Sequence, residues 1–236
     1  MNRLNLDYAT LDRPIWAALT TTQMQLGFGN QLARRYYPEV APFAALATES
    51  PECFAALGEL LSPAEQVLLK TFKPFGAIDG LNVKDIGMLN QMVLSRRNAK
   101  MAADPGIVNL SEDDADEMHE LVVRTKPGPF GERTMEMGHY IGIRDDGRLI
   151  AMAGERMRFD GFVEISAVCV DSNYRGKGLA RRLVVALGAQ IESRGETAFL
   201  HVLADNLGAI KLYKDIGFDI RQAFFLSAIS PVSTIV

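Results

Sequence analysis

The sequence predicts an α/β fold of the α+β kind, a mixed central sheet flanked by helices and preceded by a small α/β N-terminal subdomain. Apolar runs of strand length alternate with helix-length segments that carry an apolar stripe, most clearly over residues 163–170, 179–192 and 199–203. Asp145-Asp146-Gly147 separates two apolar runs and predicts a hairpin, so part of the sheet is antiparallel. The first hundred residues have a strand–helix–strand order of their own.

Composition places the chain among ordinary globular proteins. It has 236 residues, of which 48% are hydrophobic and 23% charged, enough for one large domain or two small ones. The net charge is −4 and no lysine- or arginine-rich tract occurs, so we expect no nucleic-acid partner. No apolar run reaches membrane-spanning length, and the acidic N-terminus is unlike a signal peptide. We therefore expect a cytoplasmic, reduced protein without a membrane partner.

The cysteines and histidines do not predict a disulfide or a metal centre. Cys53 and Cys169 are far apart in sequence, and His119, His139 and His201 lack the spacing of metal ligands. We expect no metal. Cys169 lies between two valines in a predicted strand, which favours a small buried side chain over a nucleophile.

The predicted N-terminal unit covers residues 1–100. A helix is expected from Pro14, and a second helix is opened by Ser50-Pro51-Glu52. Strands are expected at 42–46 and 66–72, followed by a loop over 73–80. Four aromatic residues either line a substrate pocket or form the core of this unit: Trp16, Tyr36, Tyr37 and Phe43.

The predicted C-terminal unit covers residues 101–236. A short strand at 107–110 precedes a capping box formed by Ser111 and Asp114, which opens a helix ending near Thr125. After the central strand, an apolar stripe with helical spacing predicts a helix over 179–192. Asn206 and Gly217 are suited to cap the two ends of a later helix. The remaining elements are expected as a short helix at 131–137, strands at 139–144, 148–153, 163–170 and 199–203, and final strands within 221–229.

The segment from Arg175 to Ala180 (Arg-Gly-Lys-Gly-Leu-Ala) joins a predicted strand to a predicted helix. The first N–H groups of a helix have no partner inside it, and the helix dipole adds positive potential there. Glycine lets a ligand approach the backbone, and Arg175 and Lys177 add full charges. The segment therefore predicts a pyrophosphate site.

Two motifs resemble those of a known family. The spacing is wrong for a P-loop, and Arg181 interrupts a dinucleotide fingerprint. The segment instead fits R-x-x-G-x-A, and residues 206–218 fit N-x-x-A-x-x-x-Y-x-x-x-G-F. Together they resemble the GNAT superfamily of acyl-coenzyme A dependent N-acetyltransferases, over a region from Ile107 to the C-terminus.

The resemblance implies a GNAT fold and acetyl-coenzyme A (acetyl-CoA) as the acyl donor. It implies that the backbone of Val168 and Val170 pairs with the pantetheine arm. Asn206 would contact that arm, cap its helix, or do both. The N-terminal unit would then be a degenerate partial copy of the same fold, although neither motif recurs there. The pyrophosphate would be held by Arg175, Gly176, Lys177, Gly178, Leu179 and Ala180.

Glu164 is the candidate general base, acting directly or through water. It is the charged residue inside an apolar run, and strand alternation places it on one face with Ser166 and Val168, opposite Ile165, Ala167 and Cys169. A partly desolvated carboxylate is a stronger base. The alternative is a carboxylate engaged in a salt bridge. Its position relative to Arg175 also resembles that of the family's catalytic glutamate.

Tyr213 is the candidate acid, because the resemblance places its hydroxyl near the coenzyme A sulfur. The alternative is a core tyrosine. His201 is either a second acid–base group or a histidine satisfied within its strand.

The sequence thus indicates an N-acetyltransferase that moves an acetyl group from acetyl-CoA to a primary amine by direct attack, since no positioned nucleophile is evident. Two alternatives remain: a non-catalytic module that senses acetyl-CoA or binds a partner, and an acyltransferase that uses a longer acyl-CoA. The acceptor is a small-molecule or peptide amine. A homodimer is compatible with the sequence.

Overall fold

The computed structural model describes residues 7–95 and 104–232, and its centre is an eight-stranded mixed sheet. The strand order is β4-β11-β5-β10-β9-β8-β7-β6. The β9 and β10 strands are parallel, and the other neighbours are antiparallel. The strands are β4 (Val67–Thr71), β5 (Leu81–Leu94), β6 (Ile107–Leu110), β7 (Tyr140–Asp145), β8 (Arg148–Phe159), β9 (Phe162–Val170), β10 (Thr197–Leu203) and β11 (Phe218–Pro231).

A second, three-stranded antiparallel sheet belongs to the N-terminal unit. It consists of β1 (Gly27–Gly29), β2 (Ala33–Tyr36) and β3 (Ala44–Leu46). The helices of the molecule are α1 (Pro14–Thr20), α2 (Pro51–Glu59), α3 (Ala115–Thr125), α4 (Leu179–Ser193) and α5 (Leu207–Ile216). Helices on both sides of a mixed sheet, with a small α/β unit in front, confirm the predicted fold class.

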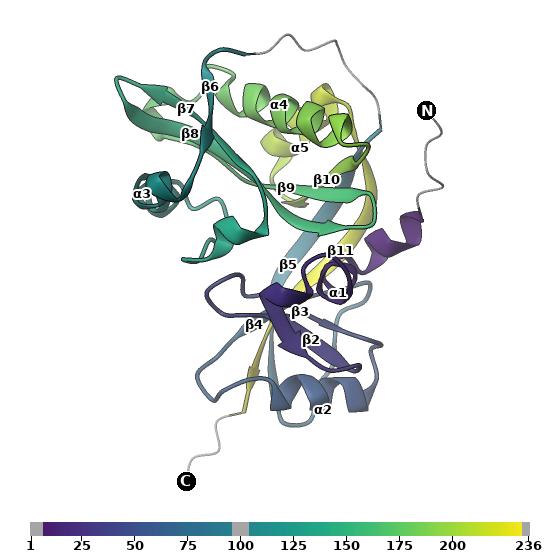
Figure 1. The fold of residues 1–236 in the computed structure, drawn as a ribbon. Helices are drawn as coiled ribbons and strands as arrows, with labels where there is room; N and C mark the ends of the chain where they lie inside the picture. Colours follow the sequence, from purple (N-terminus) through teal and green to yellow (C-terminus); the bar gives the residue numbers. More distant parts are fainter. Residues whose placement is uncertain (1–6, 96–103, 233–236) are drawn as a thin grey trace.

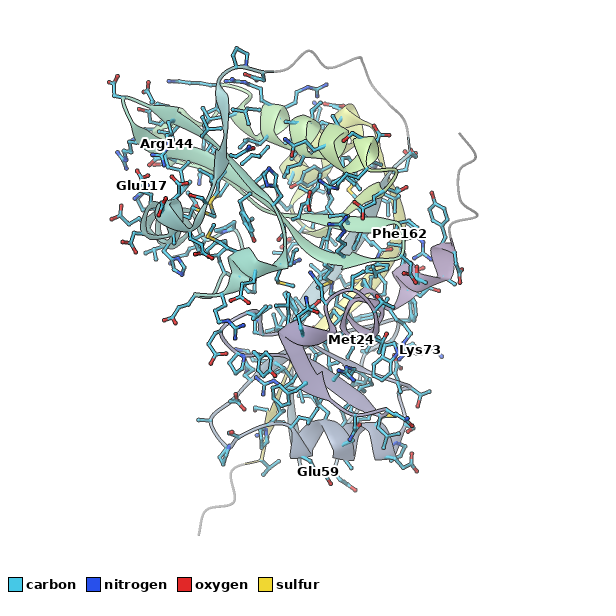
Figure 2. The ribbon with its side chains drawn as sticks, viewed as in Figure 1. Met24, Glu59, Lys73, Glu117, Arg144 and Phe162 are labelled. Atoms are coloured by element: carbon cyan, nitrogen blue, oxygen red, sulfur yellow. The ribbon has the colours of Figure 1, made fainter. Side chains whose placement is uncertain are left out.

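The two faces of the large sheet are covered differently (Figure 1). Helices α4 and α5 pack their apolar residues on one face, where Leu183, Leu187 and Ile210 are buried. On the other face, α3 covers the β7–β8 end, and α1 covers the middle of the sheet. Phe162, at the start of β9, is fully buried where the N-terminal unit meets the large sheet (Figure 2).

Strands β5 and β11 run through both parts of the molecule in Figure 1. Residues 81–94 belong to the first hundred residues, yet β5 lies between β10 and β11 in the large sheet. The expected boundary near residue 100 lies outside the described residues. The division into units 1–100 and 101–236 therefore stays a prediction. Strands from both sides of that boundary belong to the same eight-stranded sheet.

Local signals were accurate. The side chain of Ser50 accepts a hydrogen bond from the N–H of Cys53 at the start of α2, and the capping box of Ser111 and Asp114 is present. One expectation was wrong. Residues 221–229 belong to one long strand, β11, and not to several final strands, and the strands β1 and β2 were not predicted. Strand β5 carries no regular alternation and was missed; it is held by pairing with strands on both sides.

Candidate active site

The glycine-rich turn lies between β9 and α4, as expected. Gly176 and Gly178 have φ values of +77° and +75°, and a Cβ at either position would meet no atom within 4 Å. Gly178 is the N-cap of α4 and no side chain caps this end. The backbone therefore offers N–H groups toward open space, in a conformation that favours glycine.

The charges around this turn favour an anion. Arg175 and Lys177 are exposed, and the Lys177 Nζ lies 4.7 Å from the ring centroid of Tyr174. Neither side chain forms a salt bridge with any residue of the described ranges. Leu179 is buried against the sheet and fixes the start of α4. The turn from Arg175 to Ala180 thus has the backbone and charge to hold a pyrophosphate.

Strands β9 and β10 separate next to this turn. They pair from Phe162↔Thr197 to Glu164↔Phe199, and in the described residues their pairing ends there. Beyond that point β9 continues to Val170 along β8, and β10 continues to Leu203 along β5. In this region the edges of β9 and β10 face each other without pairing between them. An extended chain with amide groups, such as a pantetheine arm, fits such an opening. Residues of this structure thus fit acetyl-CoA.

A β-bulge on β9 corrects one prediction. Between the pairs Gly154↔Ser166 and Met152↔Cys169, β9 has one more residue than β8, and Ala167 has a φ of +51°. The extra residue reverses the alternation of side chains. Val168 therefore packs into the same core as Ile165, and not on the face of Glu164 as expected, while Cys169 packs beside Met118 under α3. Burial raises the pKa of the Cys169 thiol to about 11, in keeping with a buried hydrophobic role.

Glu164 is fully buried and engaged on two sides. Arg156 Nε and Nη2 each donate a hydrogen bond of 2.8 Å to its two carboxylate oxygens. His201 Nδ1 lies 2.6 Å from Oε1 of Glu164. Burial opposes ionisation of Glu164, but attraction to Arg156 and the hydrogen bonds outweigh it and hold the pKa of Glu164 well below its usual value.

Two further groups complete this cluster. Lys70 Nζ lies 3.2 Å from His201 Nδ1, and Gln91 Nε2 lies 3.3 Å from His201 Nε2. Burial lowers the pKa of Lys70 to about 7. Burial, with Lys70 adding to it, lowers the pKa of His201 to about 4. At neutral pH the imidazole is therefore uncharged, so its Nδ1–H donates to Glu164 and its Nε2 accepts from Gln91.

Tyr213 lies on the buried face of α5. Its ring packs edge-on to Phe218 with centroids 6.0 Å apart, and no hydrogen bond joins its hydroxyl to the described residues. Burial raises the pKa of Tyr213 to about 12, so the hydroxyl keeps its proton at physiological pH. The ring is a core residue, and its hydroxyl has no competing partner in that part of the chain.

Asn206 caps α5. Its Oδ1 accepts a hydrogen bond of 3.1 Å from the N–H of Ala209. Gly217, at the other end of α5, adopts φ +119° as expected for a helix C-terminus. The capping role of Asn206 is thus confirmed, and a role in coenzyme binding stays a prediction.

Sequence reasoning missed Lys70, Arg156 and Gln91. They come from β4, β8 and β5, and no local signal in the sequence shows where these strands lie in the sheet. Strand β8 lies beside β9 and β5 beside β10, while β4 is the edge strand next to β11. In the described residues no group of three or more potential metal ligands is assembled, and no helix there is long and apolar enough to cross a membrane.

Comparisons with known proteins agree with this geometry. The family model of FR47-like proteins matches residues 140–226. N-alpha-acetyltransferase RimI of Mycobacterium tuberculosis is 39% identical over 106 residues, covering 42% of this chain and 66% of that relative. The Escherichia coli [ribosomal protein bS18]-alanine N-acetyltransferase is 29% identical over 128 residues, covering 50% of this chain and 86% of the relative.

The likeness extends over nearly the whole chain in one solved structure. A GNAT-family protein of Novosphingobium aromaticivorans is 39% identical, with a TM-score of 0.88, and the match covers 94% of this chain and 99% of that one. The glycine turn, the opening between β9 and β10 and the similarity to this structure together define the fold of a GNAT acyltransferase. The protein belongs to the GNAT superfamily.

Proposed function

We propose that this protein is an N-acetyltransferase that transfers the acetyl group of acetyl-CoA to a primary amine by direct attack. The observation that carries the proposal is the position of the glycine turn beside the opening between β9 and β10. The turn fits a pyrophosphate and the opening fits an extended amide chain, and acetyl-CoA contains both of these parts. Relatives named as N-acetyltransferases support the same chemistry.

Acetyl-CoA, when bound, supplies an acetyl thioester that an amine can attack. The turn from Arg175 to Ala180 holds the pyrophosphate, and the backbone of Val168 and Val170 pairs with the pantetheine arm. The Tyr213 hydroxyl, which keeps its proton at neutral pH, donates to the departing thiolate.

In this proposal Glu164 takes the proton of the attacking amine through water, because Arg156 holds its buried carboxylate ionised. His201 orients that carboxylate and does not take the proton itself, since its Nδ1–H donates to Glu164, its Nε2 accepts from Gln91 and its pKa is lowered to about 4. The proposal predicts that Glu164→Gln alters the pH profile of turnover. An unchanged profile in Glu164→Gln would remove that residue from proton transfer, whether direct or relayed.

Calorimetric titration with acetyl-CoA tests the donor site. Gly178→Glu places a carboxylate in the cradle, and Gly195→Glu is its matched control. Gly195 lies at the other end of α4, has φ +80°, and a Cβ there would also meet no atom within 4 Å. Both variants carry the same backbone strain, so only the cradle differs.

We expect micromolar binding by the wild type and by Gly195→Glu, and none by Gly178→Glu. The acceptor is then sought by thiol release with free amines and with peptides that have a free N-terminus. A folded wild type that does not bind acetyl-CoA would overturn the proposal. Binding without thiol release from any amine would favour a sensing module.

A further inference from the structure

The N-terminal unit repeats the order of elements that builds the donor site. In the C-terminal unit, β7, β8 and β9 form an antiparallel set, α4 follows, and β10 returns parallel to β9. In the N-terminal unit, β1, β2 and β3 form an antiparallel set and α2 follows. Strand β4 then returns parallel to β3, joined by the bridge Phe43↔Leu68.

The next two strands in each unit follow the same rule. Beyond β10 come β5 and then β11, and beyond β4 come β11 and then β5. In each unit, the long strand of the other unit lies next to the returning strand, and the unit's own long strand lies one position further out. Strand β5 thus lies between β10 and β11, and β11 lies between β4 and β5. This reciprocal exchange supports the hypothesis that the N-terminal unit is a degenerate copy of the C-terminal one.

The β3 and β4 strands separate as β9 and β10 do. They meet at Phe43↔Leu68, where the Leu68 N–H donates a 2.6 Å hydrogen bond to the carbonyl of Pro42. Beyond that bridge β3 pairs with β2, and β4 pairs with β11. A cavity of about 230 Å³ lies in this opening, lined by residues 44–49 of one edge, 69–72 of the other and 12–16 of the segment that begins α1.

The chemistry of this second opening differs from that of the first. The turn that leads into α2 contains Glu49 and Glu52 and has neither glycine nor a basic residue. The side chain of Ser50 already accepts from the N–H of Cys53 in the first turn of α2. A phosphate would meet Glu49 and an occupied helix end. Arg13 and Lys70 also line the cavity, but Arg13 donates to the Leu46 carbonyl and lies over the Trp16 ring, and burial lowers the pKa of Lys70 to about 7. The opening therefore suits an extended amide chain that carries no phosphate.

Small side chains allow such a chain to approach. Ala44, Ala45 and Ala47 line the β3 side of the cavity, so little side-chain bulk lies there. Arg13 Nη2 already donates to the carbonyl of Leu46 on this edge, so an incoming chain would have to pair with the other main-chain groups of β3. Its volume is below the ~300–1,000 Å³ of drug-sized pockets, which limits the occupant to a short segment. Three other charged residues line the cavity, and each is engaged within the chain: Asp12 with Arg221, Arg13 with the Leu46 carbonyl, and Lys70 with His201. The exposed Glu49 therefore favours basic side chains at the wall.

We infer that this cavity binds a short peptide in extended conformation, between the edges of β3 and β4, with small side chains facing the alanines and basic ones near Glu49. Main-chain hydrogen bonds to the two edges supply the affinity. The site goes beyond the acetyl-transfer function and does not depend on it. Lys70, which lines the cavity, also contacts His201, so an occupant would adjoin the buried cluster.

The test is a titration of the full chain, with alanine methyl groups labelled for NMR. The probe is the peptide Ala-Lys-Ala-Lys-Ala amide. Methyl signals of Ala44, Ala45 and Ala47 report the cavity, and the signal of Ala180 in the cradle reports acetyl-CoA in the same spectrum. The two sites are thus followed separately, and failure of acetyl-CoA to shift Ala180 counts against the proposed function alone.

We expect the probe to shift the three cavity signals saturably. The same peptide N-methylated at its central residues should fail to do so, because it lacks main-chain donors. Ala47→Trp should abolish the shifts while Ala180 still responds to acetyl-CoA, which shows that the variant is folded. Equal shifts by the N-methylated peptide, or saturable shifts that persist in Ala47→Trp, would overturn the inference, as would no shift at all in the wild type.

Two charge-reversal variants test the role of Glu49 at the wall of the cavity. Glu49→Lys should weaken the lysine-containing probe about two- to fivefold, the range of an exposed ion pair. Glu59→Lys makes the same change on the same unit, at the far end of α2 and outside the cavity lining (Figure 2), and should leave binding unchanged. Equal weakening by both variants would overturn the role of Glu49.

Discussion

Arg156 and Glu164 face each other across neighbouring strands and share two hydrogen bonds of 2.8 Å, with 11% of the arginine side chain exposed and none of the glutamate. The pair is out of solvent, so its carboxylate is not free to act alone. The same contact that ionises Glu164 also lowers its basicity, because it depresses the pKa of the carboxylate.

Removing one partner of this pair should be costly. Arg156→Met leaves a buried carboxylate without its main counter-charge, and we expect a loss of about 3–5 kcal/mol in unfolding free energy. Arg156→Met combined with Glu164→Gln should lose less than the two single changes added together. The exposed pair Arg133–Glu136, at 2.6 Å and with both side chains 42% exposed, is the control. Arg133→Met should cost under about 1 kcal/mol in the same denaturant titrations.

Acid should weaken the fold in two windows. His201 has its pKa lowered to about 4 in the folded protein, so between pH 6.5 and 4 the unfolded chain binds more protons. Stability therefore falls as pH drops through that range, by an amount on the order of 3 kcal/mol. Glu164, whose folded pKa is also depressed, contributes stability above its unfolded pKa, and this is lost as pH falls further.

His201→Gln should remove most of the fall in unfolding free energy between pH 6.5 and 4, and it should leave the fall at lower pH unchanged. Urea titrations at intervals from pH 7 to pH 3 measure both. The half-buried His139, which lies outside this cluster and contacts Asn109, provides a control, because His139→Gln should leave both windows in place. A wild-type slope retained in His201→Gln would contradict the burial of a neutral imidazole.

Tyr213→Phe should separate catalysis from folding. The ring contact with Phe218 is kept, so the unfolding free energy should change by less than about 1 kcal/mol. Turnover should fall about 10²- to 10⁴-fold, the usual effect of one general acid, with the affinity for acetyl-CoA unchanged. Steady-state kinetics and calorimetry measure the two. Tyr37→Phe, at an exposed ring, should match the wild type; wild-type turnover in Tyr213→Phe would remove the acid role.

Asn206 should show two separable effects. Asn206→Ala removes the acceptor for the Ala209 N–H and should cost about 0.5–2 kcal/mol. Asn206→Ser keeps a capping oxygen and should recover most of that stability. If Asn206 also contacts the pantetheine arm, both variants should bind acetyl-CoA more weakly than the wild type. Full affinity in Asn206→Ser would limit the residue to its cap.

Features set by neighbouring residues could be predicted from the sequence. The caps at Ser50, Asn206 and Gly217 depend on one side chain or one glycine and the adjacent backbone. The turn at Gly176 and Gly178 is likewise local, so the candidate donor site follows from the sequence without the strand order.

Features set by distant pairing could not be predicted. The bulge at Ala167 places a non-glycine residue at positive φ, and no residue nearby indicates it. Its effect on Val168 therefore appears only once β8 is paired. The residues clustered around Glu164 come from four other strands, β4, β5, β8 and β10, and the long strand β5 lacks the alternation by which strands are found.

The exchange of β5 and β11 also constrains the order in which the chain can be completed. In the described residues β4 pairs with β11, which is synthesised long after it. A nascent chain that has been synthesised only as far as β5 therefore lacks the strand that joins β4 to β5. Until β11 has left the ribosome, those strand edges need protection from other chains. We expect the early part of this protein to depend on chaperones during synthesis more than a chain of two independent units would.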